Sequence, residues 1–363
     1  MTRRYSLVNG ARVIPRTPDV LQIGTDPPRC VLVHEAPLGS MDILTSLDGV
    51  RTLGQVLTEH DADPLVWHHL VEQLLTAELL TPVDRQLEDS QSISGAHLLD
   101  ERSGLVHRHG LAAAARIMQA RDDALVVVRG SSLVATSIAT VLAAAGVGHV
   151  VPEPGPARHT ATVHGAARRQ PADQDAPRRT PARVDTSAPL TAAAQSLSAA
   201  QGVLAGVLRE LYPTVRVHPP AAHQPPTMVV MVGGQMPDLG LAASYTRGRI
   251  PHLAVTAGVA RAVVGPLVIP GRSSCLSCAH RHRTDADPGW PSIARQVVAG
   301  DSRTSAFLVT AAASLAVGQV LDHIDGVTVP SAVNGTLEWR SGDLAPRRRS
   351  WVSHPDCGCR GEV

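Results

Sequence analysis

The sequence predicts an α/β protein with a mostly parallel sheet, preceded by a small winged-helix domain. Three observations lead to this fold class. Short runs of branched apolar residues alternate with helical patterns after residue 96, which is typical of a Rossmann-type sheet with helices on both faces. A hairpin pattern followed by three short helical patterns occupies residues 11–85. Two closely spaced cysteine pairs lie near the C-terminal end.

The first predicted unit covers residues 11–85. Residues 18–24 and 30–34 have the pattern of two strands, and Asp-Pro-Pro-Arg between them is typical of a turn. Helices are expected over residues 40–47, from Thr52 onward, and over 64–79, where apolar residues recur at helical spacing. A hairpin with three short helices is a winged-helix arrangement. The polar residues 86–95 are expected to link it to a second domain, residues 96–363.

The second unit begins with a predicted βαβ motif. Its strands are expected at 125–128 and 147–151, and its helix at 133–145. Residues 152–187 are rich in Pro, Arg and Ala without periodicity, so a disordered insertion is expected there. The remaining elements are a helix near 190–210, strands at 228–232 and 250–255, a strand pair within 261–269, a helix over 305–323, a strand at 333–339 and a last strand before the final cysteines.

Composition narrows the class of protein. Hydrophobic residues make up 44% of the chain and aromatic residues only 2%, so Ala, Val and Leu must build the core. The formal net charge of +1 favours neither nucleic acid nor anionic lipid. We find no apolar run of about 18 residues, as a membrane span needs, and no secretory signal. A cytoplasmic protein with no nucleic-acid or membrane partner is therefore expected.

The cysteines predict a metal site. Four of the five form two close pairs, which in a reducing compartment indicate metal ligands rather than disulfides. Zinc prefers tetrahedral thiolates, so one structural zinc is predicted on Cys275, Cys278, Cys357 and Cys359. The second pair is one residue shorter than Cys-x-x-Cys, although Gly358 permits a tight loop. His280, His282 or His354 are alternative fourth ligands, and four reduced thiols without metal are the alternative to a site.

Two other segments have plainer interpretations. The lone Cys30 lies on a predicted strand and is expected to be a small buried hydrophobic residue. Residues 280–287 mix charged and histidine side chains, and we expect a solvated loop in which Arg283 and Asp287 pair locally.

Several motifs carry a family resemblance. The run Ala-Leu-Val-Val-Val-Arg-Gly at 124–130, the Gly-Val-Gly at 146–148 and the two cysteine pairs resemble the ThiF/MoeB fold of ubiquitin-activating-type enzymes. Residues 265–278, 283–291 and 354–359 resemble more narrowly the ThiF-like cyclodehydratase partner proteins of thiazole/oxazole-modified microcin (TOMM) biosynthesis. Residues 42–53 resemble the PqqD-like leader-peptide recognition element, also called a RiPP recognition element.

The resemblance implies a nucleotide loop that this chain lacks. Active ThiF-type enzymes hold ATP phosphates on a Gly-x-Gly-x-x-Gly loop, whereas only a vestigial loop of Arg129, Gly130 and Ser131 remains here. After the second strand, Glu153 between two prolines is the one acidic residue that could meet ribose. The chain has no lysine, and no counterpart of the family's catalytic residues is found. No catalytic residue and no bound ATP are expected, although weak anion binding at Arg129 and Ser131 stays open.

The winged-helix unit has two interpretations. DNA binding through residues 64–79 is disfavoured, because that helix contains glutamates and no arginine. Peptide capture on a strand edge beside a helix is favoured, with predicted contacts from Val31, Val33, Trp67, Leu70 and Leu74. Trp67 and Leu74 are equally consistent with plain core residues.

Together these observations predict a non-catalytic scaffold that presents a leader peptide to a YcaO-type enzyme. Its expected partners are the precursor peptide and that enzyme, with a homodimer left open. The alternatives are an adenylating ThiF-family enzyme and a zinc-stabilised DNA-binding regulator.

Overall fold

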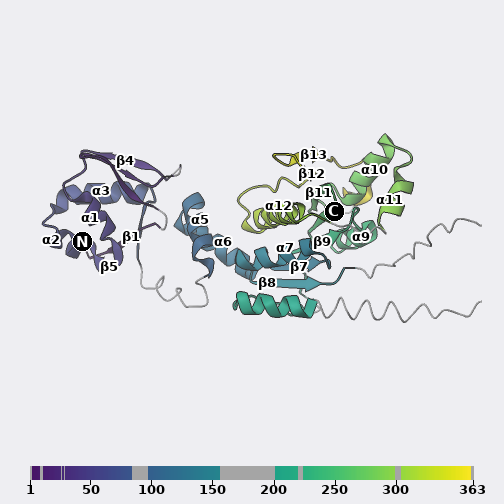
Figure 1. Cartoon of the computed structure of the whole chain (residues 1–363), viewed down its shortest axis with the longest axis horizontal. Coiled ribbons are helices and arrows are strands. Elements are labelled where there is room, and N and C mark those ends of the chain that lie inside the picture. Colours follow the sequence, from purple (N-terminus) through teal and green to yellow (C-terminus); the bar gives the residue numbers. More distant parts are fainter. Residues whose placement is uncertain are drawn as a thin grey trace, which may run out of the picture. The chain divides into compact units, whose positions relative to one another are not determined.

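The computed structural model describes residues 2–8, 11–25, 27, 29–83, 97–155, 201–219, 224–298 and 304–360. The chain divides into two compact units (Figure 1), the first formed by Met1–Asp122 with Ala144–Gly146 and the second by Asp123–Ala143 with Val147–Val363. The predicted linker at 86–95 lies outside the described residues. So does the predicted insertion from residue 156 onward, while its first residues continue a strand.

The first unit contains two three-stranded antiparallel sheets and the three predicted short helices. One sheet has the order β5 (Asp48–Thr52), β1 (Arg4–Leu7), β6 (Leu80–Pro82). The other has the order β2 (Val13–Thr17), β3 (Val20–Ile23), β4 (Val31–His34), which leaves β4 at an edge. The three short helices are α1 (Ser40–Thr45), α2 (Leu53–Glu59) and α3 (Pro64–Thr76), and two further helices follow them, α5 (Leu99–His109) and α6 (Leu111–Asp123).

Local sequence explains where α2 and α3 begin. Thr52 and Gln55 form a capping box at the start of α2. The Asp63 carboxylate accepts a hydrogen bond from the Leu65 N–H, and Pro64 occupies the first position of α3. The buried face of α3 consists of Trp67, Leu70, Val71 and Leu74.

The second unit is built on a seven-stranded sheet with the order β13-β12-β11-β10-β9-β7-β8. In chain order these strands are β7 (Leu125–Arg129), β8 (His149–Glu153), β9 (Met228–Gly233), β10 (His252–Ala257), β11 (Arg261–Val268), β12 (Gly335–Arg340) and β13 (Arg347–Ser350). The three pairings among β8, β7, β9 and β10 are parallel, and the three from β10 to β13 are antiparallel. The expectation of a mostly parallel sheet is therefore wrong, and the sheet is mixed.

The segment predicted as a strand pair within 261–269 is one continuous strand. β11 pairs antiparallel with β10 on one side and β12 on the other. Gly265 and Pro266 have the composition of a turn, yet both lie inside β11. The pairing with β10 has an irregularity at these two residues and resumes at Leu267, so the local turn signal produces a bulge and does not end the strand.

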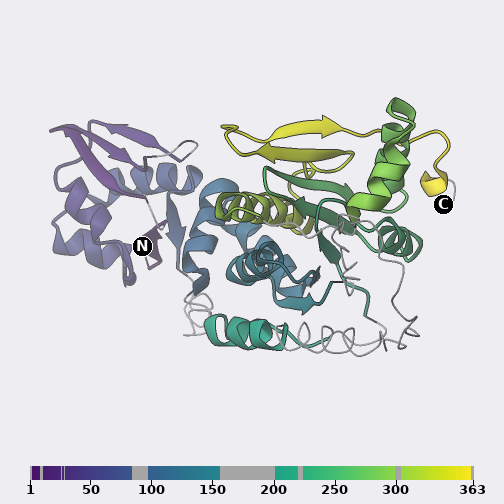
Figure 2. The ribbon, with the colours of Figure 1, turned by 45° about the vertical axis from the view of Figure 1, so that its right-hand side comes forward.

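Helices cover both faces of the large sheet (Figure 2). One apolar core joins the strands to α7 (Leu133–Ala144), to helical residues 201–211 and to α12 (Ala306–Asp325). The opposite core joins them to α9 (Leu239–Arg247) and α10 (Leu276–Ala286). Alternate residues of β7 enter the two cores, since Val126 and Val128 lie in the first and Leu125 and Val127 in the second.

The long helix expected over 305–323 is present as α12. α12 is long and apolar enough to cross a membrane by length and composition alone, and half of it is buried in this structure. It packs on β10, β11 and β12, so it acts here as a core helix of the second unit. Ser305 caps its start by accepting a hydrogen bond from the Leu308 N–H.

Candidate functional site: a four-cysteine cluster and a closed loop

The two cysteine pairs come from segments that the fold brings together. Cys275 is the N-cap of α10 and Cys278 lies in its first turn, while Cys357 and Cys359 belong to the C-terminal turn. Ser274 fixes the first segment, because its hydroxyl donates to the Trp351 carbonyl over 2.7 Å and its N–H donates to the Asn334 side chain over 2.7 Å.

The four sulfur atoms have the spacing of a tetrahedral zinc site. All lie within 4.8 Å of one another, with Sγ separations of 3.8 Å for Cys275–Cys278, 3.6 Å for Cys275–Cys357 and 3.5 Å for Cys278–Cys359. Zinc–sulfur bonds of about 2.3 Å at tetrahedral angles require separations of about 3.8 Å. The four thiols therefore fit one zinc ion, as the sequence predicts, and the short Cys357-Gly-Cys359 spacing is no obstacle.

The three histidines named as alternative ligands have other hydrogen-bond partners. His354 contacts the Asp285 carboxylate over 2.7 Å through Nε2, and its Nδ1 accepts from the Asp356 N–H over 3.1 Å. His282 contacts the Val352 carbonyl, and His280 accepts a hydrogen bond from the Trp290 indole N–H. Cys359 is therefore the better fourth ligand.

The environment shifts the pKa values of two of the thiols in opposite directions. The hydrogen bond with Cys275 lowers the pKa of the Cys278 thiol to about 4. Burial raises the pKa of the Cys359 thiol to about 11. Zinc binds thiolates, so any thiol of the cluster that is still protonated must release its proton when the metal binds.

The glycine loop after β7 is filled by the chain's own groups. The Arg129 guanidinium forms an ion pair with the Glu153 carboxylate at 2.9 Å, and the Gly130 N–H donates to the Glu153 carbonyl over 2.9 Å. The Gln201 amide donates to the Gly130 carbonyl over 2.9 Å. The Gly155 N–H donates to the Ser131 hydroxyl over 3.3 Å.

These contacts change what the loop can bind. A phosphate at this position needs free N–H groups and an unpaired cation. Here the Gly130 N–H and the Arg129 charge are both satisfied internally, and Glu153 is held by Arg129. The loop therefore resembles a closed turn more than a phosphate cradle.

The predicted peptide contacts fall into two groups. Val31 and Val33 are half-buried on the edge strand β4. Trp67, Leu70 and Leu74 are buried in the core of the first unit, with Trp67 only 1% exposed. Peptide contact by these three residues stays a prediction, and in this structure the core occupies their side chains. Cys30 is half-buried with a free thiol.

Residues 280–287 are not a solvated loop, which corrects the prediction. They belong mainly to α10, and Arg283 does not pair with Asp287 among the described residues. Its guanidinium lies over the rings of Trp290 and Trp351, at 5.3 and 4.7 Å from the ring centroids. Sequence reasoning missed this arrangement, although a tryptophan follows each of two arginine-rich segments, 281–283 and 347–349, which is a usable signal for cation–π stacking.

With its mixed sheet, small N-terminal β region and C-terminal four-cysteine cluster, the chain is an α/β protein with a ThiF/MccB-like fold. Solved structures of E. coli MccB match over nearly the whole chain. The structure with AMPCPP and MccA has a TM-score of 0.59 and 14% identity, covering 98% of this chain and 99% of that one. The structure described as microcin C7 biosynthetic enzyme MccB in complex with N-formylated MccA has a TM-score of 0.57 and 13% identity, with 98% and 99% covered.

A larger protein also contains this fold. A heterocyclase in complex with substrate and cofactor has a TM-score of 0.58 and 13% identity, and the match covers all of this chain and 40% of that one. The sequence itself matches no family model and no curated protein. The likeness is therefore one of fold.

Proposed function

We propose that the chain is a non-catalytic scaffold that binds the leader segment of a ribosomal precursor peptide and presents it to a YcaO-type cyclodehydratase. The observation that carries this proposal is the loop after β7, where Glu153 pairs with the Arg129 guanidinium and Gly130 is hydrogen-bonded to Glu153 and Gln201. It occurs in a fold shared with MccB, which binds the precursor peptide MccA.

The closed loop argues against adenylation on electrostatic grounds. Phosphoryl chemistry depends on fixed positive groups that face the phosphates. Arg129 is neutralised by Glu153, and the chain contains no lysine to replace it. An adenylating enzyme is the second candidate, because a structure of MccB with ATP has a similar fold.

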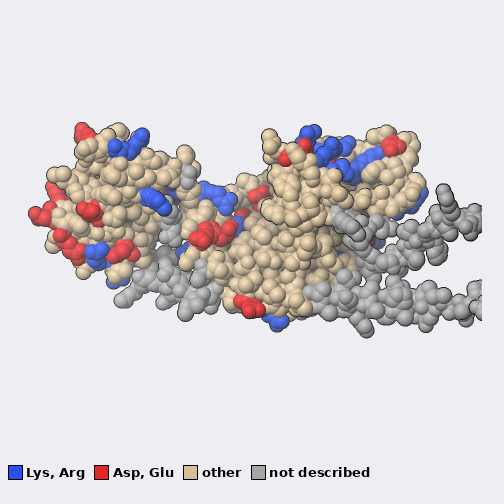
Figure 3. Space-filling view, in the orientation of Figure 1, with Lys and Arg blue, Asp and Glu red and all other residues tan. Residues whose placement is uncertain are grey.

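The first unit offers a strand edge for the peptide. β4 pairs only with β3, so one side of its backbone has no strand partner within the described residues. An extended peptide can pair with such an edge and place side chains beside it. Leu32 on β4 is 42% exposed, and it gives that edge an apolar contact. α3 contains no arginine, and Figure 3 shows acidic side chains over α1 and α2, a surface unsuited to DNA phosphates.

Zinc has a structural place in this proposal. Four sulfur ligands close the coordination sphere, so no position remains for a substrate. The reduced thiols that such a site needs fit a cytoplasmic protein. The metal would tie the start of α10 to the C-terminal turn.

Two assays on the full chain test the proposal. Fluorescence anisotropy with labelled leader segments of short peptides encoded beside the gene should give saturable binding. Leu32→Asp should weaken it at least about tenfold, whereas Val50→Asp, also at an exposed apolar strand position of the first unit, should not. Pyrophosphate exchange with ATP and the same peptides should stay at background. Exchange above background would establish the adenylating enzyme instead, and binding indifferent to Leu32→Asp would exclude the β4 edge.

A further inference from the structure

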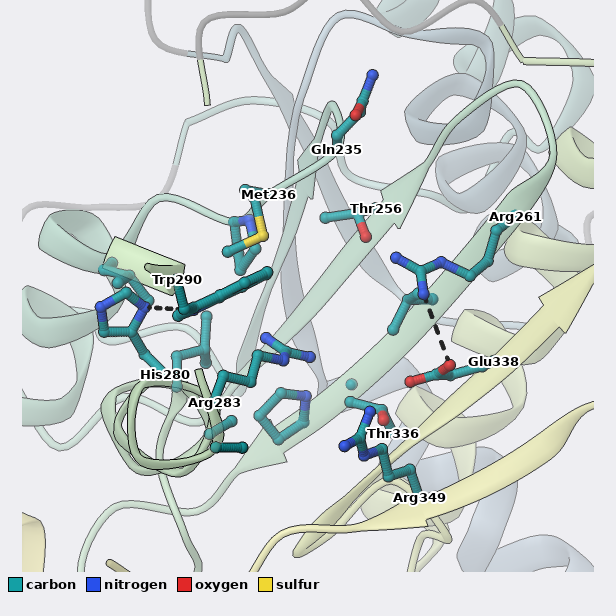
Figure 4. Close-up of a pocket in the computed structure, with 18 of the residues that line it drawn as sticks. Gln235, Met236, Thr256, Arg261, His280, Arg283, Trp290, Thr336, Glu338 and Arg349 are labelled. Atoms are coloured by element: carbon teal, nitrogen blue, oxygen red, sulfur yellow. Dashed lines mark hydrogen bonds and ion pairs between the residues drawn. The ribbon is translucent and has the colours of Figure 1, made fainter. Parts of the chain in front are cut away.

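A cavity lies on the antiparallel side of the large sheet (Figure 4). Its volume is about 270 Å³, which is several times the roughly 30 Å³ that one water occupies in the liquid. Gln235 follows β9 and Thr256 lies near the end of β10, so the cavity opens at the carboxyl ends of two parallel strands. Ligands of open α/β sheets bind at this edge.

Three arginines from three different elements enter this cavity, which we call the arginine pocket. Arg261 comes from β11, Arg283 from α10 and Arg349 from β13 (Figure 4). Figure 3 shows the same part of the surface, with arginines gathered over β12, β13 and α10. Two carboxylates, Glu338 and Asp287, also line the pocket, and three guanidiniums against two carboxylates leave one positive charge in excess.

Two of the guanidiniums are held by stacking on an aromatic ring. Arg283 and Arg349 both stack on the indole of Trp351, with guanidinium carbons 4.7 and 4.5 Å from its centroid. Trp351 is 5% exposed, and its N–H donates to the Thr336 hydroxyl over 3.1 Å. Arg261, by contrast, lies 3.8 Å from Glu338. Within the described residues neither Arg283 nor Arg349 makes a side-chain hydrogen bond or ion pair.

This arrangement stores an electrostatic cost that an anion would relieve. Burial lowers the pKa of Arg283, and the nearby charge of Arg349 lowers it further. Stacking occupies the faces of both guanidiniums and leaves their N–H edges free for an acceptor. The Nδ1 atom of His280 offers the pocket no donor, because it accepts the Trp290 N–H.

We propose that the arginine pocket binds the carboxylate of a peptide segment, with Arg283 and Arg349 donating to its oxygens. One excess positive charge matches a monoanionic carboxylate better than a dianionic phosphate. The walls contributed by Met236, Pro266 and Leu276 are apolar, so they suit the carbon atoms that accompany the carboxylate. Only the description of the ligand as a peptide rests on the proposed function; the preference for a carboxylate rests on the pocket.

The experiment follows indole N–H signals by NMR in the full chain labelled with ¹⁵N-tryptophan. The four tryptophans include Trp290 and Trp351 at the pocket and Trp67 in the first unit. N-acetylglycine supplies a C-terminal carboxylate, N-acetylaspartate amide a side-chain carboxylate, N-acetylglycine amide the uncharged control, and inorganic phosphate the competing anion. Either carboxylate should shift the Trp290 and Trp351 signals saturably while the Trp67 signal stays fixed. The probe that binds more tightly shows whether the pocket prefers a C-terminal or a side-chain carboxylate.

Variants assign the binding to the pocket. Arg283→Gln should weaken carboxylate binding about tenfold or more, since it removes a charged hydrogen-bond donor, and the exposed Arg349→Gln should weaken it without touching α10. Arg295→Gln, an exposed arginine of α11 (Trp290–Val298) outside the pocket, is the matched control. No saturable shift, equal binding of the amide, tighter binding of phosphate, or wild-type affinity in both pocket variants would overturn the proposal. These probes are too short to pair along β4, so their failure to bind would not count against leader binding at β4. Likewise, failure of leader binding would not count against carboxylate binding in the pocket.

Discussion

Replacing Cys357 by serine removes one of the four sulfur atoms that outline the predicted zinc site. The metal would join Cys275 and Cys357, which are 82 residues apart in the chain. Cross-linking a loop of that length restricts the unfolded chain by about 4.5 kcal/mol in the loop-entropy treatment used for disulfides. That is a large share of the roughly 5–15 kcal/mol by which domains are stable. For a unit of this size it corresponds to a fall in Tm of about 10–15 °C.

The assay combines metal analysis with thermal unfolding. Wild type should contain one zinc per chain and lose about 10–15 °C of Tm in a strong chelator. Cys357→Ser should hold substoichiometric zinc and unfold near the chelated wild type. Cys30→Ser is the matched control, because Cys30 lies outside the cluster, and it should keep its zinc. A wild type that is metal-free and fully folded, or a Cys357→Ser variant with unchanged zinc and Tm, would refute the reasoning.

Three further predictions concern stability. Burial lowers the pKa of His252, so below about pH 6.5 the unfolded chain binds a proton more readily than the native chain. The free energy of unfolding should therefore fall as pH drops below about 6.5, and it should fall less steeply in His252→Phe. Urea titration at several pH values measures both slopes. Trp67→Ala should cost about 3–5 kcal/mol by denaturant titration, because it empties a core position, whereas exposed Leu65→Ala should cost under about 0.5 kcal/mol. Glu101→Gln should cost about 3–5 kcal/mol in the same assay, because it removes the carboxylate 2.7 Å from the buried Arg121 guanidinium.

Each of these predictions has a contradicting outcome. Equal pH slopes in wild type and His252→Phe would show that other groups carry the acid sensitivity. A Trp67→Ala variant as stable as Leu65→Ala would mean that α3 does not hold the core of the first unit. An unchanged Glu101→Gln would show that other contacts of Arg121, such as the Ala145 carbonyl at 3.0 Å, suffice to hold its charge.

The elements that sequence predicts well are those in which local pattern and tertiary setting agree. The apolar run of β7, the helix after Gly130 and the strand β8 follow one another as expected, because a parallel strand is apolar on both faces. The same pattern does not encode strand direction, so β11 and β12 were expected in a mostly parallel sheet and are antiparallel. The short β1, β5 and β6 were missed, because β1 pairs with strands far along the chain.

The candidate sites divide in a similar way. The cysteine spacing was enough to predict the cluster, because two close pairs can meet on one ion wherever the fold joins them. The closed loop could be predicted only in part. The sequence shows that the family's glycines are absent, whereas the pairing of Arg129 with Glu153 depends on the parallel register of β7 and β8. The arginine pocket was invisible, because Arg261, Arg283 and Arg349 converge only through a mixed sheet that the sequence did not predict.

The most direct test of the scaffold role is the mass of a precursor peptide after incubation with ATP and a YcaO-type enzyme from the same gene neighbourhood. With the full chain present, the peptide should lose one water per ring formed. Without the chain, or with Leu32→Asp in its place, the loss should slow markedly, and the chain alone should leave the peptide unchanged. Equal modification without the chain, or an adenylated peptide produced by the chain alone, would contradict the account.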